Sequence, residues 1–225
     1  MRSDKKSLKR ITRPIFDDIK LFEEEFKSAL HSEVRLINMI GRYIIHHKGK
    51  LIRPILTILS SRVCGQPSLN SYKAAAMIEL LHIATLIHDD VVDGAETRRA
   101  QKAARQIWGN EASVLSGYYL LSKAFHMLTT LRNLELLQIM SRTTTLMAEG
   151  EILQLTREIG SEDEDVYLRI IYLKTACLFG SAAQAGAVLA KAPPELSEAL
   201  KRYGEALGMA FQIVDDALDL SLIHI

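Results

Sequence analysis

The sequence predicts an all-α protein built around one hydrophobic core. Apolar residues recur at spacings of three and four along almost the whole chain, and no segment alternates apolar and polar residues as a strand would. Proline, which interrupts helices, occurs only at positions 14, 54, 67, 193 and 194. With 225 residues, 48% of them hydrophobic, the chain can form one sizeable core but is too short for two comfortable domains. We therefore expect a single domain over residues 1–225, a bundle of long helices.

In the first half of the chain, glycine and proline mark where the expected helices end. These helices lie at residues 14–30, 33–47, 52–64, 70–93, 103–108 and 111–131. The breaks between them fall at Gly49, Gly65-Gln66-Pro67, Gly94 and Gly109-Asn110. Pro54 would occupy a first turn, where its missing N–H is tolerated.

The second half continues in the same way, with helices expected at 134–158, 163–175, 176–190 and 195–220. Breaks fall at Gly160 and Pro193-Pro194, and Glu195 would place a negative charge in a first turn, where it is favoured. The stretches 74–88 and 204–220 carry apolar residues on more than one face. Such helices are expected at the centre of a bundle.

Composition excludes several classes of protein. A formal net charge of +1 lacks the overall basic footprint of a nucleic-acid binder. The segment Met1–Arg13 is basic, but no apolar core follows it, so we expect a solvated, partly disordered start and no secretory signal. The apolar stretch Ala176–Ala190 falls short of the roughly 20 residues that a membrane span needs, so no transmembrane helix is expected. Cys64 and Cys177 have no metal-ligand spacing, which suits a reducing cytoplasm and excludes a zinc module.

One five-residue pattern of aspartates occurs twice, each time in an apolar helical stretch. The first copy is Asp89-Asp90-Val91-Val92-Asp93 and the second is Asp215-Asp216-Ala217-Leu218-Asp219. Residues four apart share a helix face, so the outer aspartates of each copy project side by side. Unpaired carboxylates among such apolar neighbours would be costly, which favours compensation by metal or cations. Hard oxygen ligands without cysteine suit Mg²⁺, with substrate phosphates completing its coordination.

Cationic residues close to these motifs are candidates for binding phosphate. Thr97-Arg98-Arg99 follows the first motif, and Gly49-Lys50-x-x-Arg53-Pro54 opens a helix. Lys174-Thr175 lies in an apolar run, where a buried lysine needs an anionic partner that a diphosphate could provide.

Seven ordered motifs resemble those of the trans-isoprenyl diphosphate synthases, also called polyprenyl synthetases. The resemblance runs from about residue 40 to 220 and rests on Gly49-Lys-x-x-Arg-Pro54, Glu79-x-x-His82, Leu86-Ile-His-Asp-Asp-Val-Val-Asp93, Thr97-Arg-Arg99, Gly150-Glu-x-x-Gln154, Lys174-Thr175 and Phe211-Gln-Ile-Val-Asp-Asp-x-x-Asp219. It implies a bundle of helices around a deep central cavity, usually dimeric and here expected as a cytoplasmic homodimer. It also implies that the two aspartate motifs face each other across the mouth of that cavity.

The resemblance implies a head-to-tail condensation of isopentenyl diphosphate onto an allylic prenyl diphosphate. The implied metal ligands are Asp89, Asp93, Asp215 and Asp219, holding more than one Mg²⁺ bridged by the diphosphate. The implied catalytic set comprises Asp89, Asp90, Asp93, Lys174, Asp215 and Asp216. The implied contacts to the allylic diphosphate are Arg98, Lys174, Thr175 and Gln212, and those to isopentenyl diphosphate are Lys50, Arg53, His82 and Arg99.

Two features bear on the product and on the extent of the chain. The family's short-chain members carry a bulky aromatic floor upstream of the first motif, whereas this chain has Ala84 and Thr85 there, which implies a long-chain synthase of the kind that makes quinone side chains. Family members continue well beyond the second motif, so the chain is expected to lack C-terminal helices. Departures from the family pattern are Leu51, Ala100-Gln101-Lys102 and Tyr118.

Other interpretations remain open at this point. A shorter-chain geranylgeranyl or farnesyl diphosphate synthase differs only in the cavity floor. A helical partner subunit of a heteromeric synthase fits the short C-terminus, although such subunits typically lose their aspartates. Class I terpene cyclases mix Asn, Ser or Thr with Glu in their second motif, unlike Asp215–Asp219. Glu79-x-x-His82 has the form used by di-iron bundles, but those need a second copy, which the sequence lacks.

Overall fold

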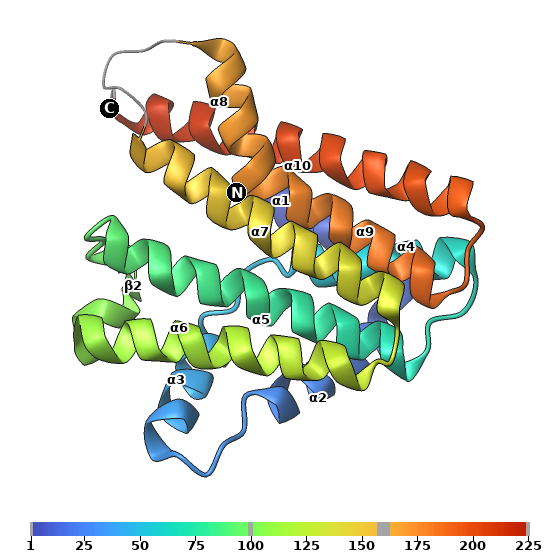
Figure 1. Ribbon diagram of the computed structural model, residues 1–225, viewed down its shortest axis with the longest axis horizontal. Helices are drawn as coiled ribbons and strands as arrows, with labels where there is room; N and C mark the ends of the chain where they lie inside the picture. The colour runs from blue at the N-terminus through green and yellow to red at the C-terminus, as the bar shows by residue number, and fades with distance from the viewer. Residues whose placement is uncertain (1, 99–100, 157–162, 224–225) are drawn as a thin grey trace. The chain divides into compact units, whose positions relative to one another are not determined.

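The computed structural model describes residues 2–98, 101–156 and 163–223, and these residues are almost entirely helical (Figure 1). They form two compact units, Met1–Ile55 with Tyr72–Arg132 and Leu56–Ser71 with Asn133–Ile225. The all-α class expected from the sequence is confirmed. Whether the chain folds as one domain stays a prediction.

The first unit contains the N-terminal helices and the helix that carries the first aspartate motif. Its elements are α1 (Arg2–Thr12), the 3₁₀ turn η1 (Arg13–Ile15), α2 (Phe16–Ala29), α3 (Arg35–His46), most of α5 (Leu69–Val92), β1 (Thr97–Arg98), β2 (Gln101–Lys102) and α6 (Ala104–Thr130). The 74–81 stretch of α5 is buried on all sides, as its apolar composition requires. Buried Asp18 of α2 accepts a hydrogen bond of 2.7 Å from the Tyr72 hydroxyl of α5, which satisfies both groups.

The second unit contains the helices that carry the other predicted site residues. Its elements are most of α4 (Ile52–Cys64), α7 (Leu134–Thr156), α8 (Glu164–Ile171), the π-helical segment η2 (Tyr172–Ala176), α9 (Cys177–Leu189) and α10 (Pro194–Ile223). Helix α9 lies against both α7 and α10, and η2 contacts the same two helices.

Small residues let the helices of the second unit approach closely. Between Cys177 and Val188 every residue of α9 except Gln184 is buried. A Cβ at Gly204 of α10 would lie only 2.8 Å from Gly180 Cα of α9, so these two backbones pack directly against each other. The apolar, small-residue composition of α9 is therefore explained by its position at the centre of this unit.

One helical run in the described part of the chain, Glu164–Leu189, is long and apolar enough to cross a membrane by length and composition alone. Of its most apolar window, 67% is buried inside the structure. The contacts of this run with α7 and α10 account for its apolar character.

The structure confirms some expected helix boundaries and corrects others. The break expected at Gly109 is present inside α6, where this residue has a φ of 83° that favours glycine. The N-terminus expected to be partly disordered instead forms α1 over Arg2–Thr12. The expected helices 163–175 and 176–190 run together through the π-helical turn η2. No sequence pattern predicted the hairpin β1–β2, because its strands of two residues are too short to show alternation.

We predict that Gly186→Ala destabilises the protein by about 1–3 kcal/mol, because the new methyl group would overlap backbone atoms. A Cβ at Gly186 of α9 would overlap the Thr57 carbonyl oxygen and lie 2.9 Å from the Ser61 amide nitrogen, both on α4. The free energy of unfolding from urea titrations measures the cost. Gly65→Ala is the matched control, because its Cβ would meet nothing closer than Ala190 O at 3.9 Å. Equal effects of the two substitutions would contradict this packing.

Candidate functional site

The first aspartate motif lies at the C-terminal end of α5. Asp89 and Asp90 occupy its last turn, and Asp93 follows directly, with its amide donating to Asp89 O over 2.8 Å. Asp90 is only 4% exposed, whereas Asp89 is half-buried and Asp93 is exposed. The helical geometry continues through Asp93, so Asp89 and Asp93 are neighbours on one face, as the sequence predicted.

A close contact between α5 and α6 fixes the residue just ahead of this motif. His88 Nε2 lies 3.0 Å from the carbonyl oxygen of Val114, so this nitrogen carries the proton that is donated. A Cβ at Gly117 of α6 would overlap the His88 imidazole. Gly117 therefore leaves the space that the His88 ring occupies, and His88 is a structural neighbour of the motif.

After the motif the chain turns through the hairpin β1–β2, with Thr97 paired to Lys102 and Arg98 to Gln101. The Tyr43 hydroxyl of α3 donates to Lys102 O over 2.8 Å and so attaches the hairpin to α3. Of the predicted phosphate ligands, Arg99 lies outside the described residues, and so does the side chain of Arg98.

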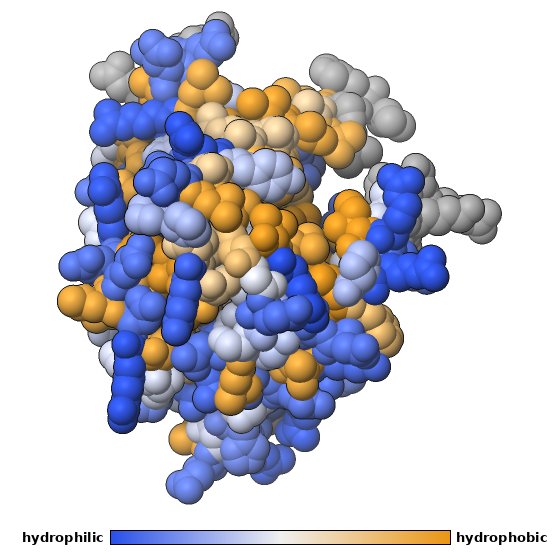
Figure 2. Space-filling view, turned by 90° about the vertical axis from the view of Figure 1, so that its right-hand side faces the viewer, coloured by the Kyte–Doolittle hydropathy of each residue, from blue (hydrophilic) through white to orange (hydrophobic). Residues whose placement is uncertain are grey.

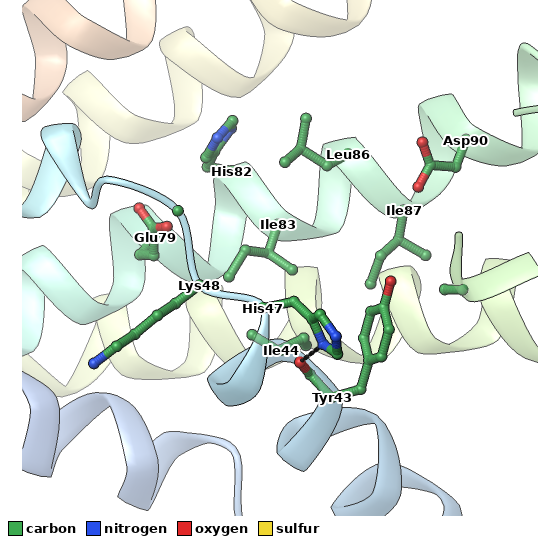
Figure 3. Close-up of a pocket in the computed structure, with 12 residues that line it drawn as sticks. Tyr43, Ile44, His47, Lys48, Glu79, His82, Ile83, Leu86, Ile87 and Asp90 are labelled. Atoms are coloured by element: carbon green, nitrogen blue, oxygen red, sulfur yellow. Dashed lines mark hydrogen bonds between the residues drawn. The ribbon is translucent and has the colours of Figure 1, made fainter. Parts of the chain in front are cut away.

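A pocket of about 70 Å³ lies in the first unit, between α3 and the face of α5 that ends at Asp90 (Figure 3). Tyr43 and His47 project from α3 towards Ile83 and Ile87 of α5, and His47 Nδ1 is bonded to Tyr43 O over 2.7 Å (Figure 3). Predicted site residue His82 also lines the pocket. At this volume the pocket has room for a few water molecules and not for a prenyl diphosphate.

The residues predicted to bind isopentenyl diphosphate differ in burial. Lys50 is exposed, and Arg53, in the first turn of α4, is buried with 9% exposure. Between them Leu51 has a φ of 53°, an unfavourable left-handed conformation for a residue with a branched side chain. Neither cation lines the pocket that contains His82.

The predicted chain-length residues lie one to two turns before the first motif. Ala84 is buried, with 1% exposure. Thr85 is half-buried, and its hydroxyl donates to His82 O over 2.8 Å. Neither side chain is a bulky aromatic group.

The second aspartate motif lies on α10. Asp215 and Asp219 are exposed, while Asp216 is half-buried and accepts hydrogen bonds on both carboxylate oxygens. Tyr167 Oη donates to Oδ2 over 2.7 Å, and Gln212 Nε2 donates to Oδ1 over 2.9 Å. The three aspartates therefore fall into two kinds, since Asp216 is held by protein donors and its two neighbours face solvent.

Lys174 and Thr175 lie on η2, the π-helical turn. Lys174 Nζ lies 2.7 Å from Glu151 Oε1 and 2.7 Å from Gln154 Oε1, both on α7. Thr175 Oγ1 donates to Gln212 Oε1 over 2.7 Å. The expectation that Lys174 is buried is wrong, because its side chain is 21% exposed, and Glu151 is an anionic partner for it within the chain.

The expectation that the motif aspartates lie buried among apolar side chains is wrong for most of them. Of the six motif aspartates only Asp90 is fully buried, and around the second motif Ile213, Val214 and Leu218 are 44%, 58% and 56% exposed. Apolar side chains reach the surface elsewhere too, as the orange residues among the blue hydrophilic ones show in Figure 2. The cost of burying charge therefore does not itself demand a cation at Asp93, Asp215 or Asp219.

The carboxylates nevertheless suit a hard divalent cation. No group of three or more His, Cys, Asp or Glu side chains is placed to hold a metal ion by itself in residues 2–98, 101–156 and 163–223. Each motif offers instead an i, i+4 pair of carboxylates, and Mg²⁺ is typically bound by one or two carboxylates together with substrate phosphates. The donors present therefore fit a cation that arrives with a phosphorylated ligand.

Tyr167 was missed from the sequence, and Glu151 was quoted within the motif Gly150–Gln154 without a role in the site. Tyr167 lies seven residues before Lys174, a spacing that two turns of helix place on one face. Burial, together with the hydrogen bond to Asp216, raises the pKa of Tyr167 from 10.0 to about 12. Burial and the hydrogen bond to Glu205 raise the pKa of Tyr172 to about 12 in the same way. Both hydroxyls thus remain protonated donors at neutral pH.

Comparison with known families identifies the family of this chain. Its residues 34–222 match the sequence profile described as Polyprenyl synthetase. The chain belongs to the polyprenyl synthetase family. The resemblance expected from the seven motifs is confirmed.

Two of its relatives in this family are named as synthases of octaprenyl and nonaprenyl diphosphate. The octaprenyl diphosphate synthase of Escherichia coli (strain K12) is 42% identical over 215 residues, which are 95% of this chain and 66% of that protein. An all-trans-nonaprenyl-diphosphate synthase (geranyl-diphosphate specific) of Rhodobacter capsulatus is 40% identical over 93% of this chain and 65% of its own length. The chain thus spans just under two thirds of the length of these two relatives.

A solved structure has the same fold. The polyprenyl synthase of Caulobacter crescentus CB15, complexed with calcium and isoprenyl diphosphate, superposes with a TM-score of 0.91 at 40% identity. The match covers 94% of this chain and 65% of that one. That relative was solved with a divalent cation and a diphosphate, the ligand pair that the carboxylates of this chain suit.

We predict that Gly117→Ala destabilises the protein by about 1–2 kcal/mol, because the methyl group displaces His88 and breaks its hydrogen bond to Val114. A double-mutant cycle with His88→Ala, read by urea unfolding, isolates this contact. In the His88→Ala background the glycine substitution should be close to neutral. An equal loss of stability in both backgrounds would show that the new methyl group does not clash with the imidazole.

The raised pKa values of Tyr167 and Tyr172 predict a loss of stability in alkaline solution. Their pKa values rise on folding from 10.0 to about 12, so the contribution to stability is complete below pH 10 and is lost as the pH rises towards 12. Tyrosinate absorbance during an alkaline titration should show these two groups among those that titrate late. Tyr167→Phe should remove one of them, and Tyr172→Phe the other. Titration of every tyrosine near pH 10 in the folded protein would contradict the assignment.

Proposed function

We propose that this protein catalyses the Mg²⁺-dependent, head-to-tail condensation of isopentenyl diphosphate onto an allylic prenyl diphosphate, giving a long-chain polyprenyl diphosphate. The observation that carries the proposal is that each of two aspartate motifs presents an i, i+4 carboxylate pair on a helix of a polyprenyl synthetase chain. The names of the relatives support the reaction class and the long product.

In the proposed reaction the C–O bond of the allylic substrate breaks and diphosphate leaves. The double bond of isopentenyl diphosphate attacks the resulting allylic cation, and the proton that is then lost passes to the released diphosphate. Bound Mg²⁺ would supply charge compensation for the leaving diphosphate. The cations would be held by two pairs of carboxylates, each pair on one face of its helix: Asp89 with Asp93, and Asp215 with Asp219. Asp90, being buried, would support Asp89 and not contact the ions.

Lys174 would add a positive charge to the same diphosphate. Its ammonium group is already oriented by Glu151 and Gln154, so little side-chain entropy is lost when it meets the ligand. A fixed cation stabilises the charge that develops on the departing group more effectively than a mobile one. Arg98 would contact the same diphosphate.

Isopentenyl diphosphate would be held by Lys50, Arg53, His82 and Arg99. His82 lines the pocket next to Lys48 and Gly49, which supports a ligand near the start of α4. Because this pocket is only about 70 Å³, binding requires the loop that contains Lys50 to move or the diphosphate to lie at the pocket's rim. The small residues Ala84 and Thr85 support a cavity that is not closed by an aromatic floor. A homodimer and a cytoplasmic location stay predictions.

An incubation with farnesyl diphosphate, labelled isopentenyl diphosphate and Mg²⁺ tests the proposal. Long prenyl products, sized by chromatography, are expected from the wild type. Asp89→Ala and Asp219→Ala should each lower the rate by about 100-fold or more, because each removes a ligand for the cations.

The matched control is Glu198→Gln, which removes an exposed carboxylate of α10 that pairs only locally with Lys201. Its activity should equal that of the wild type. Undiminished product from Asp89→Ala would exclude the proposed role of the first motif, and no prenyl product at all from the wild type would contradict the function.

A further inference from the structure

We propose that Tyr167 is a positioning residue for the second aspartate motif: with Gln212 it holds Asp216 away from the cations, so that only Asp215 and Asp219 bind them. This inference rests on the proposed function, because it concerns which carboxylates hold the cations of the substrate diphosphate. It gives Asp216 a role different from its place in the implied catalytic set, and Gln212 and Thr175 a role different from the diphosphate contacts that the family resemblance implies.

The hydrogen bonds of Asp216 support this role. Each carboxylate oxygen accepts one bond from a neutral side chain, Oδ2 from Tyr167 over 2.7 Å and Oδ1 from Gln212 over 2.9 Å. Bonds to an ionised acceptor are roughly twice as strong as those between neutral groups. Turning Asp216 towards a cation would break or bend both, while the exposed Asp215 and Asp219 need no such rearrangement.

Helix geometry separates the aspartates in the same way. Asp215 and Asp219, four residues apart, lie on one face of α10. Asp216 is about 100° further round the helix, on the side that meets α8, the helix that carries Tyr167. The contact between α8 and α10 therefore occupies the Asp216 side and leaves the Asp215 and Asp219 side accessible.

The network continues from Asp216 to the π-helical turn. Thr175 Oγ1 donates to Gln212 Oε1 over 2.7 Å, which leaves the amide NH₂ of Gln212 to face Asp216. A π-helical turn inserts one residue into a helix and changes the direction of the side chains that follow, and such turns are frequent at functional sites. Thr175 and Gln212 thus act through Asp216, and Lys174 is the residue of η2 that remains for the diphosphate.

Tyr167 is itself held in place by the start of α8. Asp163 caps this helix, accepting bonds from the Asp165 and Val166 amides over 2.9 and 3.4 Å. The Tyr167 amide donates to Asp163 O over 3.0 Å, in the first turn. The Tyr167 phenol therefore projects from a capped helix end. The cap holds the backbone of Tyr167 in place, and so its hydroxyl can orient the acceptor.

The test compares four variants for binding of cation and inorganic diphosphate. Bound Mn²⁺ is counted by electron paramagnetic resonance, and the affinity for diphosphate in the presence of Mg²⁺ is measured by calorimetry. Tyr167→Phe should bind as many Mn²⁺ ions as the wild type, with diphosphate affinity lowered by about 10-fold, as expected when a supporting residue of a metal site is lost. Tyr172→Phe is the matched control, since it removes a phenol bonded to Glu205 outside the motif, and its binding should be unchanged.

Two carboxylate variants complete the test. Asp219→Asn should lower the count of bound Mn²⁺, whereas Asp216→Asn should keep the count and weaken diphosphate binding about as much as Tyr167→Phe does. A lower Mn²⁺ count in Asp216→Asn would make Asp216 a direct ligand and overturn the inference, as would equal affinities of Tyr167→Phe and Tyr172→Phe. If the wild type shows no Mg²⁺-dependent diphosphate binding, the proposed function fails and the inference fails with it. Far-ultraviolet circular dichroism confirms that the variants are folded.

Discussion

The close approach of three backbones at the π-helical turn η2 is the constraint on which the second half of the candidate site depends. A Cβ at Gly150 of α7 would lie 2.8 Å from Leu173 Cβ, and a Cβ at Gly208 of α10 would lie 2.6 Å from Ala176 Cα. Glycine at these two positions therefore lets α7 and α10 contact η2 from either side. Lys174 can reach its acceptors on α7, and Thr175 can donate a hydrogen bond to α10, only because the backbones are this close.

The same packing explains why the charged groups of this region have fixed geometry although they are partly exposed. Lys174 has two acceptors on α7, and Asp216 has two donors from α8 and α10. Such networks orient side chains before any ligand arrives, which lowers the entropy that binding costs. The first motif has a counterpart in the His88 contact with α6, where Gly117 makes the space. For the first motif the glycine that allows the supporting contact lies on the neighbouring helix α6, and for the second motif Gly208 lies on α10 itself.

Sequence patterns predicted the fold class and the breaks between helices, because apolar spacing and glycine at positive φ, as at Gly109, act locally. The π-helical turn was not predicted, since one inserted residue hardly disturbs the apolar spacing of the run 163–190. The sequence motifs contain most of the candidate residues. They do not show which hydrogen-bond partners give these residues different roles. Tyr167 and Asp216 are 49 residues apart, and the exposure of Ile213 and Val214 depends on packing that no local pattern records.

The proposed function depends on both aspartate motifs binding divalent cations together with a diphosphate. The most direct test is a crystal structure of the protein grown with Mn²⁺ and a non-reactive thiolodiphosphate analogue of the allylic substrate, in which anomalous scattering locates the metal. We expect Mn²⁺ against Asp89 and Asp93 and against Asp215 and Asp219, with the diphosphate oxygens completing the coordination and Lys174 in contact with them. Mn²⁺ bound away from either carboxylate pair, or a diphosphate held without metal, would contradict it.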